Sequence, residues 1–375
     1  MPEAQNQDEL MMRRAIELSM KARVLAPPNP WVGCVIINDG EIVGEGYTQP
    51  PGQAHAEVIA LLQAKEKAKG STVYVTLEPC SHHGKTPPCS EALIKAQVAR
   101  VVIALQDPDL NVNGKGVKQL RAAGIEVVTG CCTHDVAKSL VPYLHHRKTG
   151  KPYCIVKGAV SIDGRIAASD GTSQWISSPE ARRQSHRLRA QSQAIIVGAG
   201  TARIDRPRLT VRDVSEFPLS PPLRVILDAK GSVPPEGPLF DTKIAPTLIF
   251  TTQECPQHVK DKWKLCGVET VTIAGAKNNV GVDLEAVLDE LGSRGVLQAI
   301  VDGGGTLIGA FLESELFQSF RVDIGTCIIG DQGLPLAKLK NIPTLSRAIK
   351  FKLIETEVFG DTVHLSYEPN NIESL

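Results

Sequence analysis

Residues Ala54–Leu93 read AHAEVIALLQAKEKAKGSTVYVTLEPCSHHGKTPPCSEAL. The apolar spacing from residue 55 onward predicts a helix, and the β-branched run STVYVTL that follows predicts a strand. The run CSEALIKAQ then predicts a second helix. Helix, strand and helix in succession indicate an α/β domain whose sheet is largely parallel.

Three potential metal ligands lie at the ends of these elements, namely His55, Cys80 and Cys89. One imidazole and two thiolates give zinc three protein ligands and leave a fourth position for water, which is the catalytic arrangement. Zinc bound in this way lowers the pKa of its water toward neutrality. Glu57 is not needed as a ligand, and we expect it to carry protons as the general acid and base. Zinc deaminases of nucleobases combine these same groups, so we expect a deaminase with one Zn²⁺ per chain.

Simpler explanations exist for each of these residues. A lone His-x-Glu is common, and two nearby cysteines can be small buried hydrophobic residues. A closed structural zinc site needs a fourth ligand, which His82 or His83 could supply. The ordered combination of His-x-Glu, strand, Pro-Cys, gap and Cys favours the catalytic interpretation.

Size and composition indicate two soluble α/β domains. The chain has 375 residues, with 42% hydrophobic and 22% charged residues, and this length favours two cores. Lysine plus arginine equals aspartate plus glutamate, at 41 each, which argues against nucleic acid binding through bulk charge. We found no membrane-length apolar run and no secretory signal. Nine cysteines without disulfide-like spacing favour a reducing cytoplasm.

The alternation of strands and helices is interrupted at VPYLHHRKTGKPY, residues 141–153. This segment is polar and basic and contains Gly150 and Pro152, which are typical of a boundary. We therefore divide the chain into domains 1–150 and 151–375. Before the boundary, Asp39-Gly40 predicts a hairpin turn, and residues 8–24 have the apolar period of a helix.

The second domain contains DGGGTLIG, residues 302–309, between a predicted strand and a predicted helix. Backbone amides and a helix N-terminus in this arrangement can hold phosphate. The pattern is not the G-x-G-x-x-G of a Rossmann unit, and a tight turn without a ligand explains it equally well on local sequence alone. Earlier in this domain, the basic run Arg203, Arg206 and Arg208 follows Thr201 and is a candidate for reading a cofactor 2′-phosphate.

The chain resembles a known family in motifs that span its length. PNPWVGCVI (28–36), HAEVIAL (55–61) and EPCSHHGKTPPC (78–89) are similar to motifs of the bifunctional riboflavin-biosynthesis deaminase–reductases. SIDGRIA, SQWIS, VGAGTARIDRPRLTVR and VDGGGTLIGAFLE follow in the order of the reductase half of that family. Nucleoside and tRNA deaminases instead carry Pro-Cys-x-x-Cys, whereas eight residues separate the two cysteines here.

The resemblance implies a cytidine-deaminase-like three-layer α/β domain followed by a dihydrofolate-reductase-like α/β domain that uses NADPH. It places cofactor contacts at Ala159, Trp175, Thr201, Asp205, Gly304, Gly305, Thr306, Leu307, Ile308, Gly309 and Ala310. It places substrate contacts at His82, Lys85, Ser173, Arg189, Leu209, Arg212 and Asp302. Lys85 suits a 5′-phosphate as a point charge, and the two arginines suit forked bonds to phosphate. A solvated loop and a solvated helix face are the alternatives for these charged residues.

Two positions depart from the family pattern. The family has histidine after GEGY, where this chain has Thr48. The family has DPNP where this chain has Asp107-Pro108-Asp109-Leu110. Both positions face substrate in the family, so these departures bear on substrate contacts and not on the zinc chemistry.

The resemblance implies two successive reactions in the cytoplasm. The first is deamination of 2,5-diamino-6-ribosylamino-4(3H)-pyrimidinone 5′-phosphate, and the second is reduction of the ribosyl group of 5-amino-6-(5-phosphoribosylamino)uracil to ribityl. We expect small-molecule pyrimidine ribonucleotide substrates, no nucleic acid or membrane partner, and a homo-oligomer. The alternatives are a free-base, nucleoside or tRNA deaminase with an unrelated second domain, and a non-enzymatic module with structural zinc. The presence of Glu57 argues against the non-enzymatic module.

Overall fold

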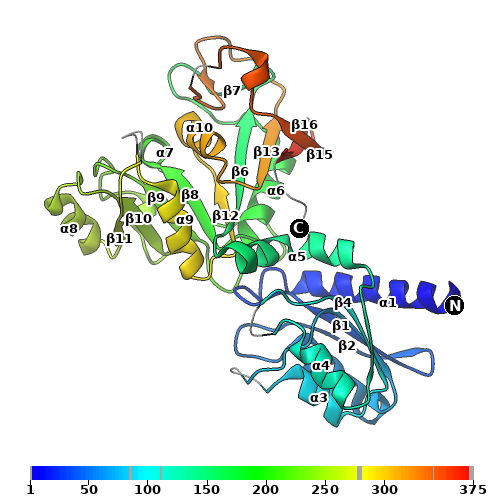
Figure 1. Ribbon diagram of the computed structural model, residues 1–375. Coiled ribbons are helices and arrows are strands. Elements are labelled where there is room, and N and C mark those ends of the chain that lie inside the picture. Colours follow the sequence, from blue (N-terminus) through cyan, green and yellow to red (C-terminus); the bar gives the residue numbers. More distant parts are fainter. Residues whose placement is uncertain (1, 84–86, 110–111, 277–280, 341, 371–375) are drawn as a thin grey trace. The chain divides into compact units, whose positions relative to one another are not determined.

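The computed structural model describes residues 2–83, 87–109, 112–276, 281–340 and 342–370. Within residues 54–93 it shows helix, strand and helix in succession. The chain divides into two compact units between Thr149 and Gly150, called unit 1 and unit 2 below. In Figure 1 unit 1 runs from blue to cyan and unit 2 from green to red. Within the described residues, no helix combines the length and apolar character needed to span a bilayer.

Unit 1 has one five-stranded sheet in the order β2-β1-β3-β4-β5. Strand β1 pairs antiparallel with β2 and β3, and β3, β4 and β5 run parallel. The turn of the β1–β2 hairpin is Asp39-Gly40, both with positive φ, as the sequence predicts. The elements are α1 (Pro2–Lys21), β1 (Gly33–Asn38), β2 (Glu41–Tyr47), α2 (Ala56–Ala64), η1 (Lys65–Ala68), β3 (Thr72–Leu77), α3 (Cys89–Lys95), β4 (Arg100–Leu105), α4 (Lys115–Ala122), β5 (Glu126–Thr129) and α5 (Thr133–Thr149).

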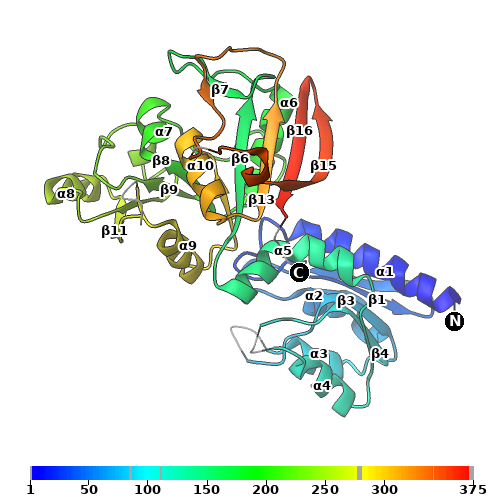
Figure 2. The same cartoon turned by 45° about the horizontal axis from the view of Figure 1, so that its top comes forward.

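Helices cover both faces of this sheet, which makes unit 1 three-layered, as expected. Gly44 of β2 faces α2, because a Cβ there would lie 2.2 Å from the carbonyl oxygen of Ala60. Gly33 of β1 points to the opposite face, where a Cβ would lie 1.8 Å from the carbonyl oxygen of Ala15 in α1. Figures 1 and 2 show α1 and α5 on one side of the sheet and α3 and α4 on the other. The glycines therefore allow both helix layers to approach the sheet closely.

The interruption expected at residues 141–153 is mostly helical, which corrects the sequence interpretation. Helix α5 continues through Pro142 to Thr149. Its buried side chains include Val136, Leu140 and Tyr143, spaced at three to four residues, so they form one apolar face against the sheet. Burial of this face outweighs the single hydrogen bond that proline removes.

Unit 2 has a nine-stranded sheet in the order β11-β10-β9-β8-β12-β6-β13-β16-β15, and a short β14–β7 ribbon. The strands from β11 to β13 are parallel, and β16 and β15 close the sheet as antiparallel strands. The elements are β6 (Tyr153–Val160), β7 (Arg165–Ala167), α6 (Pro179–Ala190), β8 (Ala194–Gly198), α7 (Ala199–Ile204), β9 (Leu223–Leu227), η2 (Pro238–Phe240), β10 (Thr247–Thr251), α8 (Gln257–Leu265), β11 (Glu269–Thr272), α9 (Leu284–Ser293), β12 (Gln298–Val301), α10 (Gly305–Ser314), β13 (Ser319–Ile324), β14 (Leu334–Pro335), η3 (Leu345–Arg347), β15 (Phe351–Phe359) and β16 (Thr362–Pro369). The sheet of unit 2 is therefore mixed, with its antiparallel strands at one end.

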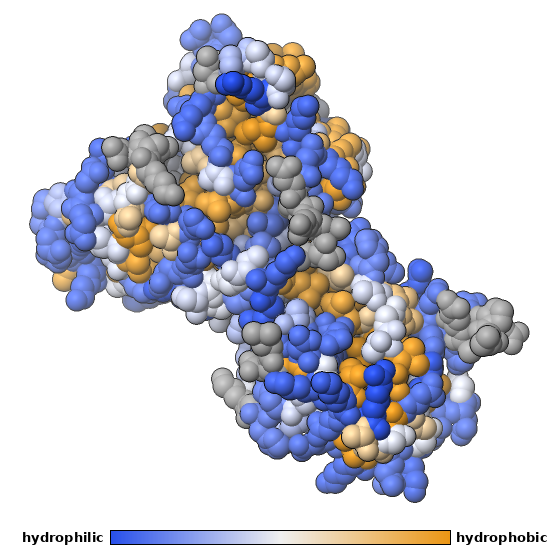
Figure 3. All heavy atoms as spheres, viewed as in Figure 1, coloured by the Kyte–Doolittle hydropathy of each residue, from blue (hydrophilic) through white to orange (hydrophobic). Residues whose placement is uncertain are grey.

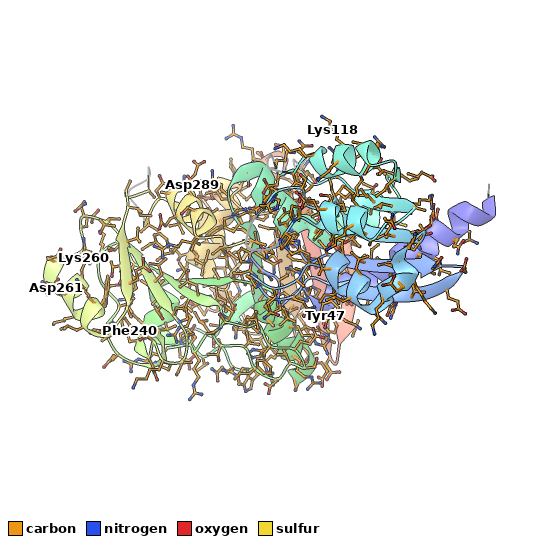
Figure 4. The ribbon with its side chains drawn as sticks, turned by 90° about the horizontal axis from the view of Figure 1, so that it is seen from below. Tyr47, Lys118, Phe240, Lys260, Asp261 and Asp289 are labelled. Atoms are coloured by element: carbon orange, nitrogen blue, oxygen red, sulfur yellow. The ribbon has the colours of Figure 1, made fainter. Side chains whose placement is uncertain are left out.

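Two hydrophobic cores lie on the two faces of the unit 2 sheet. One contains Ile196 of β8 together with α9 and α10 side chains such as Val287 and Phe311. The other contains Ile195 of β8 together with Trp263 of α8. Figure 4 shows Lys260 and Asp261 of α8 and Asp289 of α9 on the outer surface. Polar side chains cover most of the face seen in Figure 3, with apolar residues gathered in patches.

Candidate active sites

The predicted metal ligands of unit 1 lie together. His55 directly precedes α2, Cys80 follows β3, and Cys89 is the first residue of α3. The Nδ1 atom of His55 lies 3.5 Å from the Cys80 Sγ and 3.3 Å from the Cys89 Sγ. The three potential ligand atoms all lie within 4.8 Å of one another. Two helix N-termini therefore meet at the end of a central strand and bring one nitrogen and two sulfur ligands to one point.

This spacing fits zinc. Tetrahedral zinc with N and S ligands separates neighbouring ligand atoms by roughly 3.5–3.8 Å, given the usual bond lengths. Among the described residues, neither His82 nor His83 belongs to the cluster of potential ligands. His83 is exposed and lies 3.8 Å from the Glu91 carboxylate. The structure thus does not support a closed site with His82 or His83 as its fourth ligand.

Glu57 lies in the first turn of α2 and is only 3% exposed. Burial, and secondarily the Cys80 thiolate, raise the pKa of Glu57 to about 7. A hydrogen bond from the Cys89 thiol, together with His55, lowers the pKa of Cys80 to about 4, and the same coupling raises the pKa of Cys89. A carboxyl group with a pKa near neutrality can both accept and donate a proton, as general acid–base catalysis requires.

Neighbouring groups position Cys80 and Cys89. The Ser90 hydroxyl donates to the Cys80 carbonyl oxygen at 3.0 Å, and the Cys89 backbone N–H points to the Cys80 Sγ at 3.4 Å. Glu78, which precedes Pro-Cys in the motif, accepts hydrogen bonds from the backbone N–H groups of Gly114 (2.9 Å) and Val117 (3.1 Å). Glu78 therefore satisfies the N-terminal amides of α4 and has a positioning role that sequence reasoning did not assign.

A pocket of about 370 Å³ adjoins the ligand cluster and is lined by His55, Glu57 and Cys80. His82, a predicted substrate contact, lines this pocket, whereas the predicted contact Lys85 falls outside the described residues. Thr48 also lines the pocket. Its hydroxyl oxygen accepts a hydrogen bond from the Val32 backbone N–H at 3.0 Å. Asp107, Asp109, Tyr143 and Arg147 complete one wall.

The second site lies where central strands of unit 2 end. Asp302 follows β12, the glycine turn follows Asp302, and α10 begins at Gly305. The Thr201 hydroxyl of α7 accepts a hydrogen bond from the Gly304 backbone N–H at 3.2 Å. Parallel strands that end beside a glycine turn and a helix N-terminus form a phosphate-binding arrangement.

A pocket of about 940 Å³ opens at this edge. Predicted cofactor positions on its lining are Ala159, Trp175, Thr201, Asp205, Gly304, Gly305, Thr306 and Leu307. All five predicted substrate positions of unit 2 are also on the lining, namely Ser173, Arg189, Leu209, Arg212 and Asp302. Ile308, Gly309 and Ala310 are not: Ile308 is fully buried in the core, and a Cβ on Gly309 would lie 2.2 Å from the Lys338 carbonyl oxygen.

Positive charge gathers around the substrate positions of this pocket. The Arg189 Nη2 donates to the Asp302 carboxylate at 2.6 Å. Burial alone would raise the pKa of Asp302. The positive charges of Arg189 and Lys157 outweigh this effect, so the pKa of Asp302 lies below its ordinary value. Burial, with Arg189 and Arg212 nearby, lowers the pKa of His186 to about 4. The buried Arg189 Nε has no hydrogen-bond partner among the described residues, which fits a site that binds an anion.

Some residues of unit 2 that matter for the site were missed from sequence, and others were misplaced. Lys157 of β6 lines the pocket, and its Nζ lies 3.6 Å from the Asp323 carboxylate. The available signal was a lysine within the otherwise apolar strand YCIVKGAV. Arg203, Arg206 and Arg208 do not line the pocket, and Arg206 pairs with Glu236 at 2.6 Å.

Comparisons with known proteins match both units. Residues 5–105 match the cytidine and deoxycytidylate deaminase zinc-binding region, and residues 152–365 match the RibD C-terminal domain. The chain is 43% identical to the riboflavin biosynthesis protein RibD of Chlamydia trachomatis, covering 98% of this chain and 97% of that protein. It is 41% identical to Escherichia coli RibD, covering 96% and 98%. Acinetobacter baumannii RibD superposes with a TM-score of 0.89 at 35% identity, over 98% of this chain and 100% of that one.

The chain belongs to the RibD family. It is therefore a bifunctional enzyme of riboflavin biosynthesis, with a zinc-dependent deaminase and an NADPH-dependent reductase. This RibD-family assignment agrees with the resemblance of the motifs. It excludes the two alternatives weighed above, a deaminase with an unrelated second domain and a non-enzymatic zinc module.

Proposed function

We propose that residues 1–150 deaminate 2,5-diamino-6-ribosylamino-4(3H)-pyrimidinone 5′-phosphate and that residues 151–375 reduce the ribosyl group of the product to ribityl. A solved relative from Thermotoga maritima, 33% identical with a TM-score of 0.85, is described as a diaminohydroxyphosphoribosylaminopyrimidine deaminase/5-amino-6-(5-phosphoribosylamino)uracil reductase. The observation that carries the proposal is the pair of pockets, one beside three metal ligands and one beside a glycine turn.

In the deaminase pocket, His55, Cys80 and Cys89 are the proposed zinc ligands. Bound zinc supplies an activated water for attack at the ring carbon that bears the amine. Glu57 accepts a proton from that water and passes protons to the ring nitrogen and the departing amine. Its burial beside the ligands supports this role, because a shielded carboxyl holds its proton near neutral pH.

In the reductase pocket, Gly304, Gly305 and Thr306 at the start of α10 are proposed to seat the NADPH pyrophosphate. Arg189 and Arg212 are proposed to bind the substrate phosphate, and Asp302 its hydroxyl groups. The Nε of Arg189 has no hydrogen-bond partner among the described residues, and nearby arginines lower the pKa of His186; both observations support an anion at this place. Lys157 lies beside Asp302 in the same lining and is a candidate to hold charge near the reacting sugar.

We further propose that the enzyme works in the cytoplasm on small molecules, without nucleic acid or membrane partners, as a homo-oligomer. All nine cysteines are free thiols, which fits a reducing compartment. Equal numbers of acidic and basic residues leave no bulk charge for nucleic acid.

The order of the two reactions tests the proposal directly. Purified enzyme should oxidise NADPH when given the diaminopyrimidine substrate, because deamination supplies the substrate for reduction. After removal of zinc by a chelator, this oxidation should stop, while NADPH oxidation started from the deaminated intermediate should continue. Zinc-independent oxidation from the first substrate would contradict the assignment.

A further inference from the structure

One wall of the deaminase pocket is formed by two residue pairs from β4 and α5. Asp107 and Asp109 follow β4, and Tyr143 and Arg147 are four residues apart on α5. The Tyr143 hydroxyl lies 3.1 and 3.2 Å from the two oxygens of the Asp107 carboxylate. The Arg147 guanidinium lies over the Tyr143 ring at 4.9 Å, and its Nε lies 3.2 Å from the Asp109 carboxylate. The guanidinium is thus held in place at the pocket wall.

Arg147 retains hydrogen-bonding capacity despite these contacts. Its buried Nε makes an ionic contact to Asp109 but no hydrogen bond with a described residue. Its Nη1 lies 3.1 Å from the His146 Nδ1. Guanidinium presents five N–H donors in a rigid fork, so donors remain for a ligand in the pocket.

Apart from the proposed zinc ion and the predicted phosphate contact Lys85, which falls outside the described residues, the pocket lining offers an anionic substrate little positive charge. Its acidic residues are Glu57, Glu78, Asp107 and Asp109. Among the described lining residues, Arg147 is the only lysine or arginine. A phosphate dianion in such a pocket is repelled unless a cation meets it, and arginine is the side chain best suited to bind phosphate through two parallel hydrogen bonds.

Two further lining residues bear on the same guanidinium. Thr48 offers the pocket no charge, and its hydroxyl oxygen already accepts a hydrogen bond from the Val32 backbone N–H at 3.0 Å. Asp109 adds a carboxylate to the lining, and the Arg147 Nε lies 3.2 Å from it. The guanidinium therefore offsets negative charge at this wall.

We propose that Arg147 binds the 5′-phosphate of the pyrimidine ribonucleotide in the deaminase pocket and makes the enzyme selective for phosphorylated substrate. Tyr143 and Asp109 orient the guanidinium. The inference rests on the deaminase pocket proposed above.

The test compares the nucleotide with the riboside that lacks its phosphate. In Arg147→Gln, kcat/KM for the nucleotide should fall about 10- to 100-fold, mainly through KM, because charge-assisted hydrogen bonds are lost. Deamination of the riboside should stay within about threefold, since the riboside has no phosphate to lose. Arg147→Lys keeps the charge but not the fork, and should lie between wild type and Arg147→Gln.

Arg121→Gln is the matched control, because Arg121 is in unit 1, is exposed and does not line the pocket. It should not change the nucleotide-to-riboside ratio. Equal losses on both substrates in Arg147→Gln and Arg147→Lys would show a merely structural role, and an unchanged ratio would show that Arg147 does not bind the phosphate. Failure of the wild-type enzyme to deaminate either compound would instead refute the proposed function.

Discussion

The potential zinc ligands of unit 1 come from residues 55–89, whereas the pocket of unit 2 is lined from Lys157 to Lys338. The first pocket measures about 370 Å³ and the second about 940 Å³. The first depends on four reactive side chains. The second depends on backbone: strand ends, a glycine turn and the start of α10.

This contrast reflects what each reaction needs from the protein. Hydrolytic deamination needs ligands and a proton carrier at fixed positions, and only side chains can supply them. Hydride transfer brings its chemistry in the cofactor, so the protein mainly has to bind and orient it. Removal of one side chain should therefore abolish the first activity, while the second should also respond to atoms added where the backbone must stay bare.

The largest expected effect is at Glu57. We predict that Glu57→Gln lowers deamination about 100-fold or more, the usual scale for a general acid and base. Zinc content and fold should persist, because glutamine has the same shape and Glu57 is not one of the clustered ligands. Deamination rates, metal analysis and NADPH oxidation from the deaminated intermediate should be measured on one preparation.

The converse variant for unit 2 is Asp302→Ala, which should weaken reduction and spare deamination. Removal of the Asp302 carboxylate leaves Arg189 without the ion-pair partner that its Nη2 contacts at 2.6 Å. Asp261→Asn is a suitable control, because Asp261 lies on the outer surface of α8 (Figure 4). If either Glu57→Gln or Asp302→Ala reduced both activities in a folded protein, the sites would not be independent.

The sequence predicts the site of unit 1 better than that of unit 2, because reactive side chains can be recognised in a sequence and backbone geometry mostly cannot. His55, Cys80 and Cys89 could be grouped because cysteine and histidine at zinc spacing have few other uses. The wall formed by Tyr143 and Arg147 was missed, because the polar and basic residues before Gly150 and Pro152 made the end of α5 resemble a linker. In unit 2, the glycine turn was found from sequence. The same pattern cannot tell glycines that face a ligand from those that face a neighbouring segment, and the structure separates Gly304 from Gly309 on this basis.

The difference between Gly304 and Gly309 gives a further prediction, of an intermediate effect. A Cβ on Gly304 would meet only the Thr201 Oγ1 at 3.7 Å, whereas a Cβ on Gly309 would lie 2.2 Å from the Lys338 carbonyl oxygen. Gly304→Ala should therefore fold normally and raise the KM for NADPH by about three- to tenfold, since the added methyl enters the space of the pyrophosphate.

Gly309→Ala should instead destabilise the fold by about 1–3 kcal/mol, as expected for overpacking, without a specific change in the KM for NADPH. Thermal melting and steady-state kinetics of both variants separate these outcomes. A stable Gly309→Ala enzyme with a raised KM would mean that Gly309 contacts the cofactor and that the pocket extends further along α10.

The smallest expected effect concerns protonation of His186 on α6. Burial, then Arg189 and Arg212, lower its pKa to about 4, while nearby Asp213 acts in the opposite direction. Unfolded histidine has a pKa of about 6.5. Between these values only the unfolded chain binds the proton, so stability should fall as the pH drops from about 6.5 to about 4, by about 1–2 kcal/mol.

An NMR titration of the intact chain, with the His186 signal assigned by its loss in His186→Gln, should show a neutral ring at pH 5. Inorganic phosphate bound by the two arginines should raise the pKa, because it offsets their charge. A ring that is already protonated at pH 6 without phosphate would show that the pocket lacks the positive potential assigned to it.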